Sequence, residues 1–155
     1  PELFFFFVLA GEDPIDHAQR EMLASGRALH PLIERISRIH VIEEARHIAF
    51  ARHYLRRHVP RLRGPRLFIL RLRTAIVMAV AARMMSRPSG HIVRTYGIPA
   101  DVLRQAYGPG SKGAAHIKRA LFKPRELAWE LGVLNERWAP LWKALGTYAP
   151  QGSPV

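Results

Sequence analysis

Hydrophobic residues recur at helical spacing along most of this chain. The opening segment, from Glu2 to about Ser25, has a bulky apolar start that turns polar after Gly11, as expected for one long helix. Pro14 lies inside this segment, and because proline removes a backbone donor, we expect it to kink or restart the helix. Ser25 and Gly26 then predict a break.

A second and longer helix is predicted from Pro31 to the neighbourhood of Pro60. The fixed φ of proline suits a first helical turn. Arginines lie largely between the apolar positions, which gives the segment an apolar and a polar face. The apolar positions are Leu32, Ile33, Ile36, Ile39, Ile42, Ile48 and Phe50. A helix of this length can span a helical bundle.

The pattern after residue 60 also predicts helices. A turn at Gly64 and Pro65 precedes a strongly apolar segment, residues 67–85, that arginines interrupt. A membrane-spanning helix needs about twenty nearly charge-free residues. The uninterrupted stretch from Thr74 to Ala82 is far shorter, so we expect a buried helix and no membrane contact. Shorter helices are predicted near residues 100–106, 111–122, 124–131 and 138–145, before a flexible tail at 148–155.

The predicted fold class is all-α, because no segment shows β-alternation of useful length and no internal repeat is present. Prolines and glycines between residues 88 and 99 predict a looser connection. The length of 155 residues and the hydrophobic fraction of 48% indicate one domain. A chain of this size can bury about two-thirds of its unfolded surface, which is enough for a real core.

The net charge of +12 is concentrated in the middle of the chain. Residues 45–100 contain twelve arginines and no acidic residue. Such a stripe fits nucleic acid, anionic lipid, an acidic partner, or an acidic segment of a longer parent chain. A basic all-α module that binds nucleic acid or another partner without metal is therefore the alternative function, with charge as its only support.

Three potential metal ligands share one face of the second predicted helix. His40, Glu44 and His47 stand at i, i+4 and i+7, within roughly 60° of arc, and the same face continues to Tyr54. Burying a carboxylate and two imidazoles on a partly apolar face costs several kcal/mol unless they are paired or bind a metal. Because cysteine is absent, only His and carboxylate groups can hold that metal.

The pair formed by Glu44 and His47 has the Glu-x-x-His spacing of di-iron carboxylate bundles. In those bundles a glutamate from another helix adds a ligand. Glu12 is the candidate for that glutamate, because it lies where the apolar run of the first helix ends. Asp16 lies one turn later on the same face, so it is a candidate for supporting the ligands or lining the pocket.

Two other interpretations of these residues exist. A Glu-x-x-His match is common on helices, so an ordinary surface pair is one alternative. A zinc hydrolase would need His-Glu-x-x-His, whereas His40 is followed by Val41. Glycine-rich phosphate loops and a nucleophile-elbow signature are absent from the sequence as well. Nucleophilic catalysis therefore has no support.

Two stretches of the chain resemble a known family. Residues 7–20 read Phe-Val-Leu-Ala-Gly-Glu-Asp-Pro-Ile-Asp-His-Ala-Gln-Arg, and residues 39–48 read Ile-His-Val-Ile-Glu-Glu-Ala-Arg-His-Ile. They resemble the p-aminobenzoate N-oxygenase family of di-iron proteins. The late His-x-x-x-Glu-x-x-His motif of that family matches His40, Glu44 and His47, and its third-helix glutamate matches Glu12.

The resemblance implies a ferritin-like helical bundle in which two iron ions, with manganese as the alternative metal, activate O₂. The implied protein is an oxidoreductase that oxidises an amine or a similar small organic substrate and receives electrons from a donor. Arg119, or another arginine of the downstream helices, is the candidate for pairing a substrate carboxylate, and Tyr54 for lining the pocket. We expect a cytoplasmic location and no nucleic-acid partner.

The same family also uses a Glu and a Glu-x-x-His from two earlier helices, and no residue before Glu12 supplies them. The resemblance therefore implies that residues 1–147 are the C-terminal part of a longer oxygenase domain whose N-terminal helices are missing here. A half-site of this kind would leave apolar stripes exposed. Dimerisation or repacking of the chain would cover them, and a homodimer that rebuilds a four-helix site is a hypothesis.

Overall fold

The structure, a computed structural model, describes residues 1–108 and 110–153. These residues form helices joined by turns and contain no strand, so the all-α prediction is confirmed for them. The helices are α1 (Glu2–Ala24), α2 (Pro31–His58), η1 (Val59–Arg61), α3 (Gly64–Ser86), α4 (Gly90–Thr95), α5 (Ala100–Tyr107), α6 (Lys112–Ala120), α7 (Phe122–Glu130) and α8 (Ala139–Ala144).

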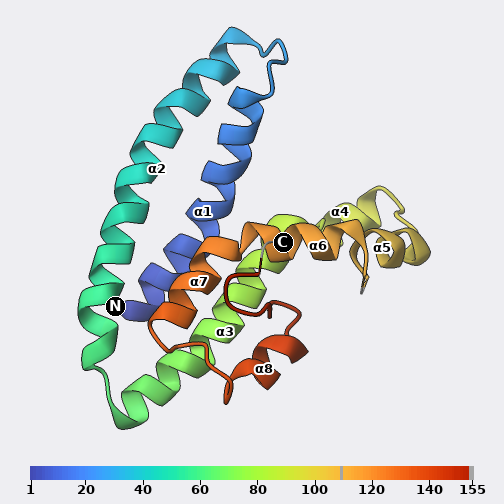
Figure 1. The fold of residues 1–155 in the computed structure, drawn as a ribbon. Coiled ribbons are helices and arrows are strands. Elements are labelled where there is room, and N and C mark those ends of the chain that lie inside the picture. Colours follow the sequence, from blue (N-terminus) through green and yellow to red (C-terminus); the bar gives the residue numbers. More distant parts are fainter. Residues whose placement is uncertain (109, 154–155) are drawn as a thin grey trace.

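The helices α1 and α2 pack side by side as an antiparallel hairpin, and α3 packs along α1 (Figure 1). The helix α7 also contacts α1, and α4 to α6 form an arm that projects from this body (Figure 1). Within the described residues, no helix is both long enough and apolar enough to cross a bilayer. The helix α1 contacts α2, α3, α6 and α7, so it is the central element of the fold.

The core lies around the first half of α1. Its largest fully buried apolar side chains come from α1, α2, α3 and the C-terminal helices. Examples are Phe6, Leu9, Leu55, Met78 and Trp142. Each buried aliphatic or aromatic side chain of this kind stabilises the fold by about 1.5–3 kcal/mol relative to an exposed one. The core thus fixes α1 against α2 on one side and against α3 and α7 on the other.

Two local features refine what the sequence predicts. The helix α1 continues through Pro14, so of the two predicted effects of this proline the restart does not occur. Proline inside a helix costs about 3 kcal/mol, but Ala10 and Pro14 are both buried, and packing along the helix offsets that cost. The helix α4 forms where a looser connection was expected, because the Ser89 hydroxyl accepts a hydrogen bond from the Ile92 amide and so caps it.

The described part of the predicted tail, residues 148–153, lies against α7. The indole Nε1 of Trp129 donates to the carbonyl of Ala149 at 3.2 Å, and the Trp129 and Tyr148 rings meet edge to face. The Gly152 amide donates to the carboxylate of Glu126 at 3.1 Å. Residues 154–155 lie outside the described residues, and the flexibility of the tail stays a prediction.

A buried ion pair joins the middle of α1 to α2. The carboxylate of Asp13 is 1% exposed, and Nη2 of Arg52 donates to both of its oxygens at 2.7 and 2.8 Å. Burial raises the pKa of Asp13, while the hydrogen bonds and charge of Arg52 lower it. Because an unpaired charge at this position would be very unfavourable, the pair fixes the register of the hairpin.

We predict that Arg52→Leu destabilises the protein by about 3 kcal/mol or more, because it leaves the Asp13 carboxyl buried without its partner. Arg56→Leu is the matched control one turn later on α2. It breaks the exposed pair with Glu130, which should cost less than about 1 kcal/mol. Urea denaturation followed by circular dichroism measures both. Equal losses in the two variants would contradict a structural role for the buried pair.

Candidate metal centre

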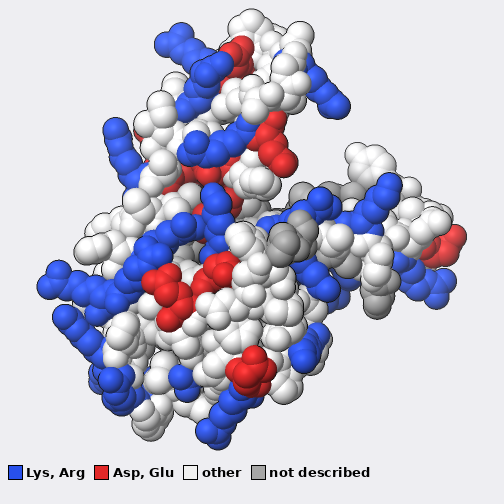
Figure 2. All heavy atoms as spheres, viewed as in Figure 1, with Lys and Arg blue, Asp and Glu red and all other residues white. Residues whose placement is uncertain are grey.

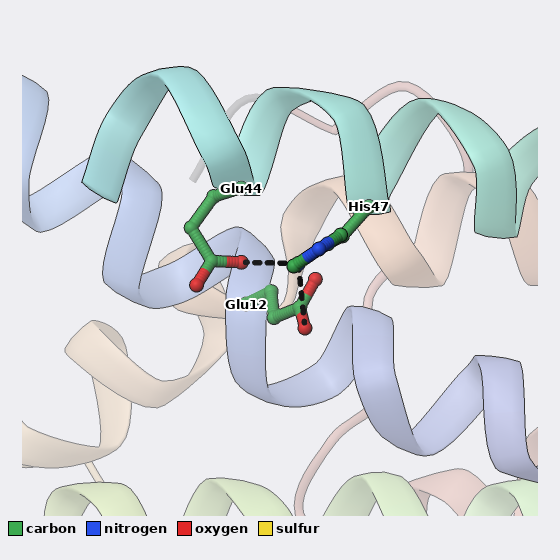
Figure 3. Close-up of side chains that lie close together, drawn as sticks. All are labelled: Glu12, Glu44 and His47. Atoms are coloured by element: carbon green, nitrogen blue, oxygen red, sulfur yellow. Dashed lines mark ion pairs between the residues drawn. The ribbon is translucent and has the colours of Figure 1, made fainter. Parts of the chain in front are cut away.

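The α1–α2 hairpin brings three of the predicted ligands together. Glu44 and His47 project from α2 towards Glu12 on α1 (Figure 3). One ligand atom from each residue lies within 4.8 Å of the other two. The imidazole Nδ1 of His47 is 3.7 Å from Oε1 of Glu12 and 4.0 Å from Oε2 of Glu44. No other group of three or more His or acidic side chains in the described part of the chain has this arrangement.

The position of each ligand follows from the helices that carry it. Residues at i and i+3 lie on one side of a helix, so Glu44 and His47 face the same neighbour. Glu12 faces them because Asp13, the next residue on α1, is held by Arg52 of α2. The hairpin therefore sets the distance between the two glutamates independently of any ion.

One carboxylate oxygen of each glutamate lacks a hydrogen-bond partner. Oε2 of Glu12 and Oε2 of Glu44 are both buried and have no hydrogen-bond partner. Burial raises the pKa of Glu12 to about 7, and a hydrogen bond with Glu44 and the charge of Glu44 add to the rise. The nearby His47 lowers the pKa by a smaller amount. Two close carboxylates with orphaned oxygens and an imidazole fit a divalent cation.

His40 contacts this cluster from one turn earlier on α2. Its Nε2 is 3.3 Å from Oε1 of Glu44, but it does not belong to the group whose atoms all lie within 4.8 Å of one another. Its Nδ1 lies within hydrogen-bond distance of the side-chain amide of Gln19 on α1. That contact fixes the ring orientation, as partners of metal-binding histidines commonly do.

Gln19 was not among the residues predicted from the sequence. It lies seven positions after Glu12, which is two turns along the same face of α1. This spacing mirrors that of His40 and His47 on α2. Heptad spacing from Glu12 was therefore the signal that could have identified it.

The other predicted residues lie apart from the cluster. Both carboxylate oxygens of Asp16 accept from Nε of Arg20 at 2.8 Å, so Asp16 is occupied on its own helix. The ring of Tyr54 stacks on the ring of His58, with 4.0 Å between the ring centres, and its centre lies 4.4 Å from that of the Phe5 ring. Arg119 is exposed on α6 and has no hydrogen bond or ion pair with any described residue of the cluster. Their predicted roles at the centre stay predictions.

One side of the cluster faces outward. The side chain of His47 is 61% exposed, whereas Glu44 is 8% exposed. By helical spacing, Phe50 lies beside His47, and Ile15 lies beside Glu12. These neighbours belong to a larger set of exposed apolar side chains on both helices. The set is Phe4, Phe7, Ile15, Leu32, Ile33, Ile36, Ile39, Ile42 and Phe50. An exposed apolar surface around a half-open ligand cluster indicates that something else packs there.

Comparison with known proteins agrees with this geometry. The sequence pattern that defines the family described as P-aminobenzoate N-oxygenase AurF matches residues 1–132. The chain belongs to this family. The resemblance found in the two sequence stretches is thus confirmed, and the all-α bundle is consistent with a ferritin-like fold. The matched range contains all four predicted ligands of this AurF-family chain.

Similar full-length proteins have no described activity. Rv0885 of Mycobacterium tuberculosis (strain ATCC 25618 / H37Rv) and Mb0909 of Mycobacterium bovis are each named as uncharacterized and are each 35% identical over 143 residues. The match covers 92% of this chain and 42% of each relative, so the chain spans less than half their length. No solved structure matches the chain significantly.

We predict that the metal-free protein becomes less stable as pH rises from about 5 to about 8. The folded-state pKa of Glu12, about 7, lies above its ordinary value of 4.5, so the folded protein holds this proton more tightly than the unfolded chain. The stabilisation is present below the lower pKa and is lost through the higher one. Melting temperatures across this range, measured with a chelator present, test the prediction.

Glu12→Gln should flatten this pH dependence, because an amide does not titrate. Glu21→Gln is the control, since Glu21 lies on the same helix and its side chain is 72% exposed. It should leave the profile as in the parent chain. A profile that Glu12→Gln leaves unchanged would contradict the shifted proton of Glu12.

Proposed function

We propose that this chain carries part of the ligand set of a di-iron oxygenase that oxidises an amine or a similar small organic substrate. The observation that carries the proposal is the cluster of Glu12, Glu44 and His47, with two orphaned carboxylate oxygens, in a chain of the AurF family. Family membership supports the reaction class. The cluster supports the place of the metal.

In this proposal each ligand has a distinct part. Glu12 and Glu44 would bind or bridge iron through the carboxylate oxygens that lack partners. His47 would bind as a neutral imidazole through Nδ1, the nitrogen nearest both glutamates. His40 would add a further imidazole, because its Nε2 already lies 3.3 Å from Glu44. Manganese is the alternative metal for the same ligands.

The iron, when bound, would supply O₂ activation with electrons from a separate donor. The protein's own part is to orient the ligands and exclude water. Gln19 holds the His40 ring, and the Asp13–Arg52 pair holds Glu12 opposite Glu44. Glu12 would release its proton as the metal binds, because a carboxylate ligand must be ionised.

The remaining ligands of a two-iron centre would come from outside the described residues. The exposed apolar side chains beside His47 mark where the helices that carry them would pack. A longer parent chain or a second copy can supply such helices. A homodimer is the hypothesis for this chain alone, and sedimentation equilibrium that shows only an iron-free monomer would contradict it.

Substrate and location follow only from the family. An amine is expected as the substrate, with Arg119 as the candidate that pairs a carboxylate on it. Arg119 is exposed on α6, so it would have to meet that substrate at the surface of the arm. A cytoplasmic location is also part of this proposal.

We predict that His47→Ala lowers the affinity for Fe(II) by about 10- to 100-fold or more. Loss of a residue that only supports a metal ligand already costs about that much. Glu44→Gln should have a similar effect, because it removes the carboxylate between the two histidines. Anaerobic titration with Fe(II), followed by elemental analysis, measures affinity and stoichiometry together.

His53→Ala is the matched control for this titration. His53 is exposed on α2, six positions after His47, and does not belong to the cluster. It should bind iron as the parent chain does. Equal iron binding by the His47→Ala and His53→Ala variants would contradict the proposed centre. Binding of DNA that weakens steeply with salt, without iron uptake, would favour the basic module instead.

A further inference from the structure

A cavity lies away from the ligand cluster, between α3, the arm and the C-terminal segment. Its volume is about 600 Å³. It is lined by the second half of α3, the end of α5, Lys118 of α6 and residues 143–147. None of its lining residues belongs to the Glu12, Glu44 and His47 cluster. The cavity is large enough for a small organic ligand.

The polar side of this cavity is strongly basic. Its described lining residues include four cationic side chains and no acidic one. The four are Arg83, Arg87, Lys118 and Lys143. In the described part of the chain, none of them forms an ion pair with a carboxylate. In Figure 2, Lys and Arg side chains lie along the arm and the neighbouring part of the body. The positive charge around the cavity is therefore uncompensated.

Two of these cations are held by neutral partners. Nη2 of Arg87 donates to the carbonyl of Tyr107 at 2.7 Å, and its guanidinium lies over the Tyr107 ring. The ammonium of Lys143 lies 4.8 Å from the centre of the Tyr148 ring. These contacts position the cations and leave their charge available to a ligand.

Buried polar groups behind the cavity also lack partners. Thr147, which lines the cavity, is 2% exposed, and its Oγ1 has no hydrogen-bond partner. Arg125 is fully buried, and only its Nη1 has partners, the carbonyls of Lys118 and Thr147. Its Nε and Nη2 have none, and burial lowers its pKa. A buried guanidinium with two unpartnered nitrogens favours an anion nearby.

Part of the cavity wall is apolar. Ile76, Val80 and Leu145 form this apolar wall, together with small alanine side chains. Inorganic phosphate would leave it uncovered. A ligand with both an acidic group and an apolar body would contact the apolar wall and the cations.

We propose that this cavity binds a small organic anion, whose carboxylate or phosphate group pairs with Arg83, Arg87, Lys118 and Lys143 and whose apolar body packs on Ile76 and Val80. The proposal does not depend on the metal centre. It assigns a role to part of the basic residues that the oxygenase proposal leaves unused.

The test uses 4-fluorobenzoate as the probe and ¹⁹F NMR of the full chain. Arg83→Gln combined with Lys118→Gln should weaken binding about tenfold or more, because two charge-assisted contacts are lost. Arg73→Gln is the matched control, an exposed arginine of α3 that does not line the cavity. It should leave the affinity unchanged. Magnetisation transfer from the Ile76 and Val80 methyl groups to the probe should place the ring in the cavity.

Three results would overturn the proposal. The first is equal binding of 4-fluorobenzoate by the double variant and the Arg73→Gln control. The second is equally tight binding of the neutral 4-fluorobenzamide, which would show that charge is not recognised. The third is equally tight binding of inorganic phosphate, which would show that the apolar wall contributes nothing. Circular dichroism checks that the variants are folded, and the methyl contacts of the parent chain test the location independently of any variant.

Discussion

The antiparallel packing of α1 on α2 determines the other features of this protein, and the buried Asp13–Arg52 pair holds that packing in register. A shift of either helix by one residue would separate the pair and rotate Glu12 away from Glu44. The free energy that keeps the pair together therefore also keeps the two glutamates close. Burial, together with a hydrogen bond to Glu44 and the charge of Glu44, raises the pKa of Glu12, and the surrounding structure sustains this arrangement. The α1–α2 hairpin therefore positions the ligand cluster.

The long helices were predictable from the sequence because their signals are local and repeated. Pro31 at a first turn and apolar residues at helical spacing located α2, and the turn at Gly64 located α3. The faces of those helices placed Glu12, Glu44 and His47 together, and the structure brings them together. The motifs that carried the family resemblance are those same ligand positions, so the family was also recognisable.

Features that depend on contacts between helices were not predictable in this way. Asp13 and Arg52 are 39 residues apart, and nothing local marks them as partners. The pairing of Asp16 with Arg20, one turn away, was not predicted either, and the role of Asp16 near the ligands stays a prediction. Leu32, Ile36 and Ile39 belong to the apolar face that the helix pattern predicted, and they are exposed here, as expected for a half-site. Periodicity shows that a face is apolar and does not show what covers it.

The exposure of His47 bears on how such a centre could be filled. Its imidazole faces outward while Glu12 and Glu44 lie deeper in the hairpin. An ion can therefore meet His47 first and pass inward to the carboxylates without any separation of α1 from α2. A helix that packs on this side of the hairpin would cover His47 and, with it, the open side of the cluster.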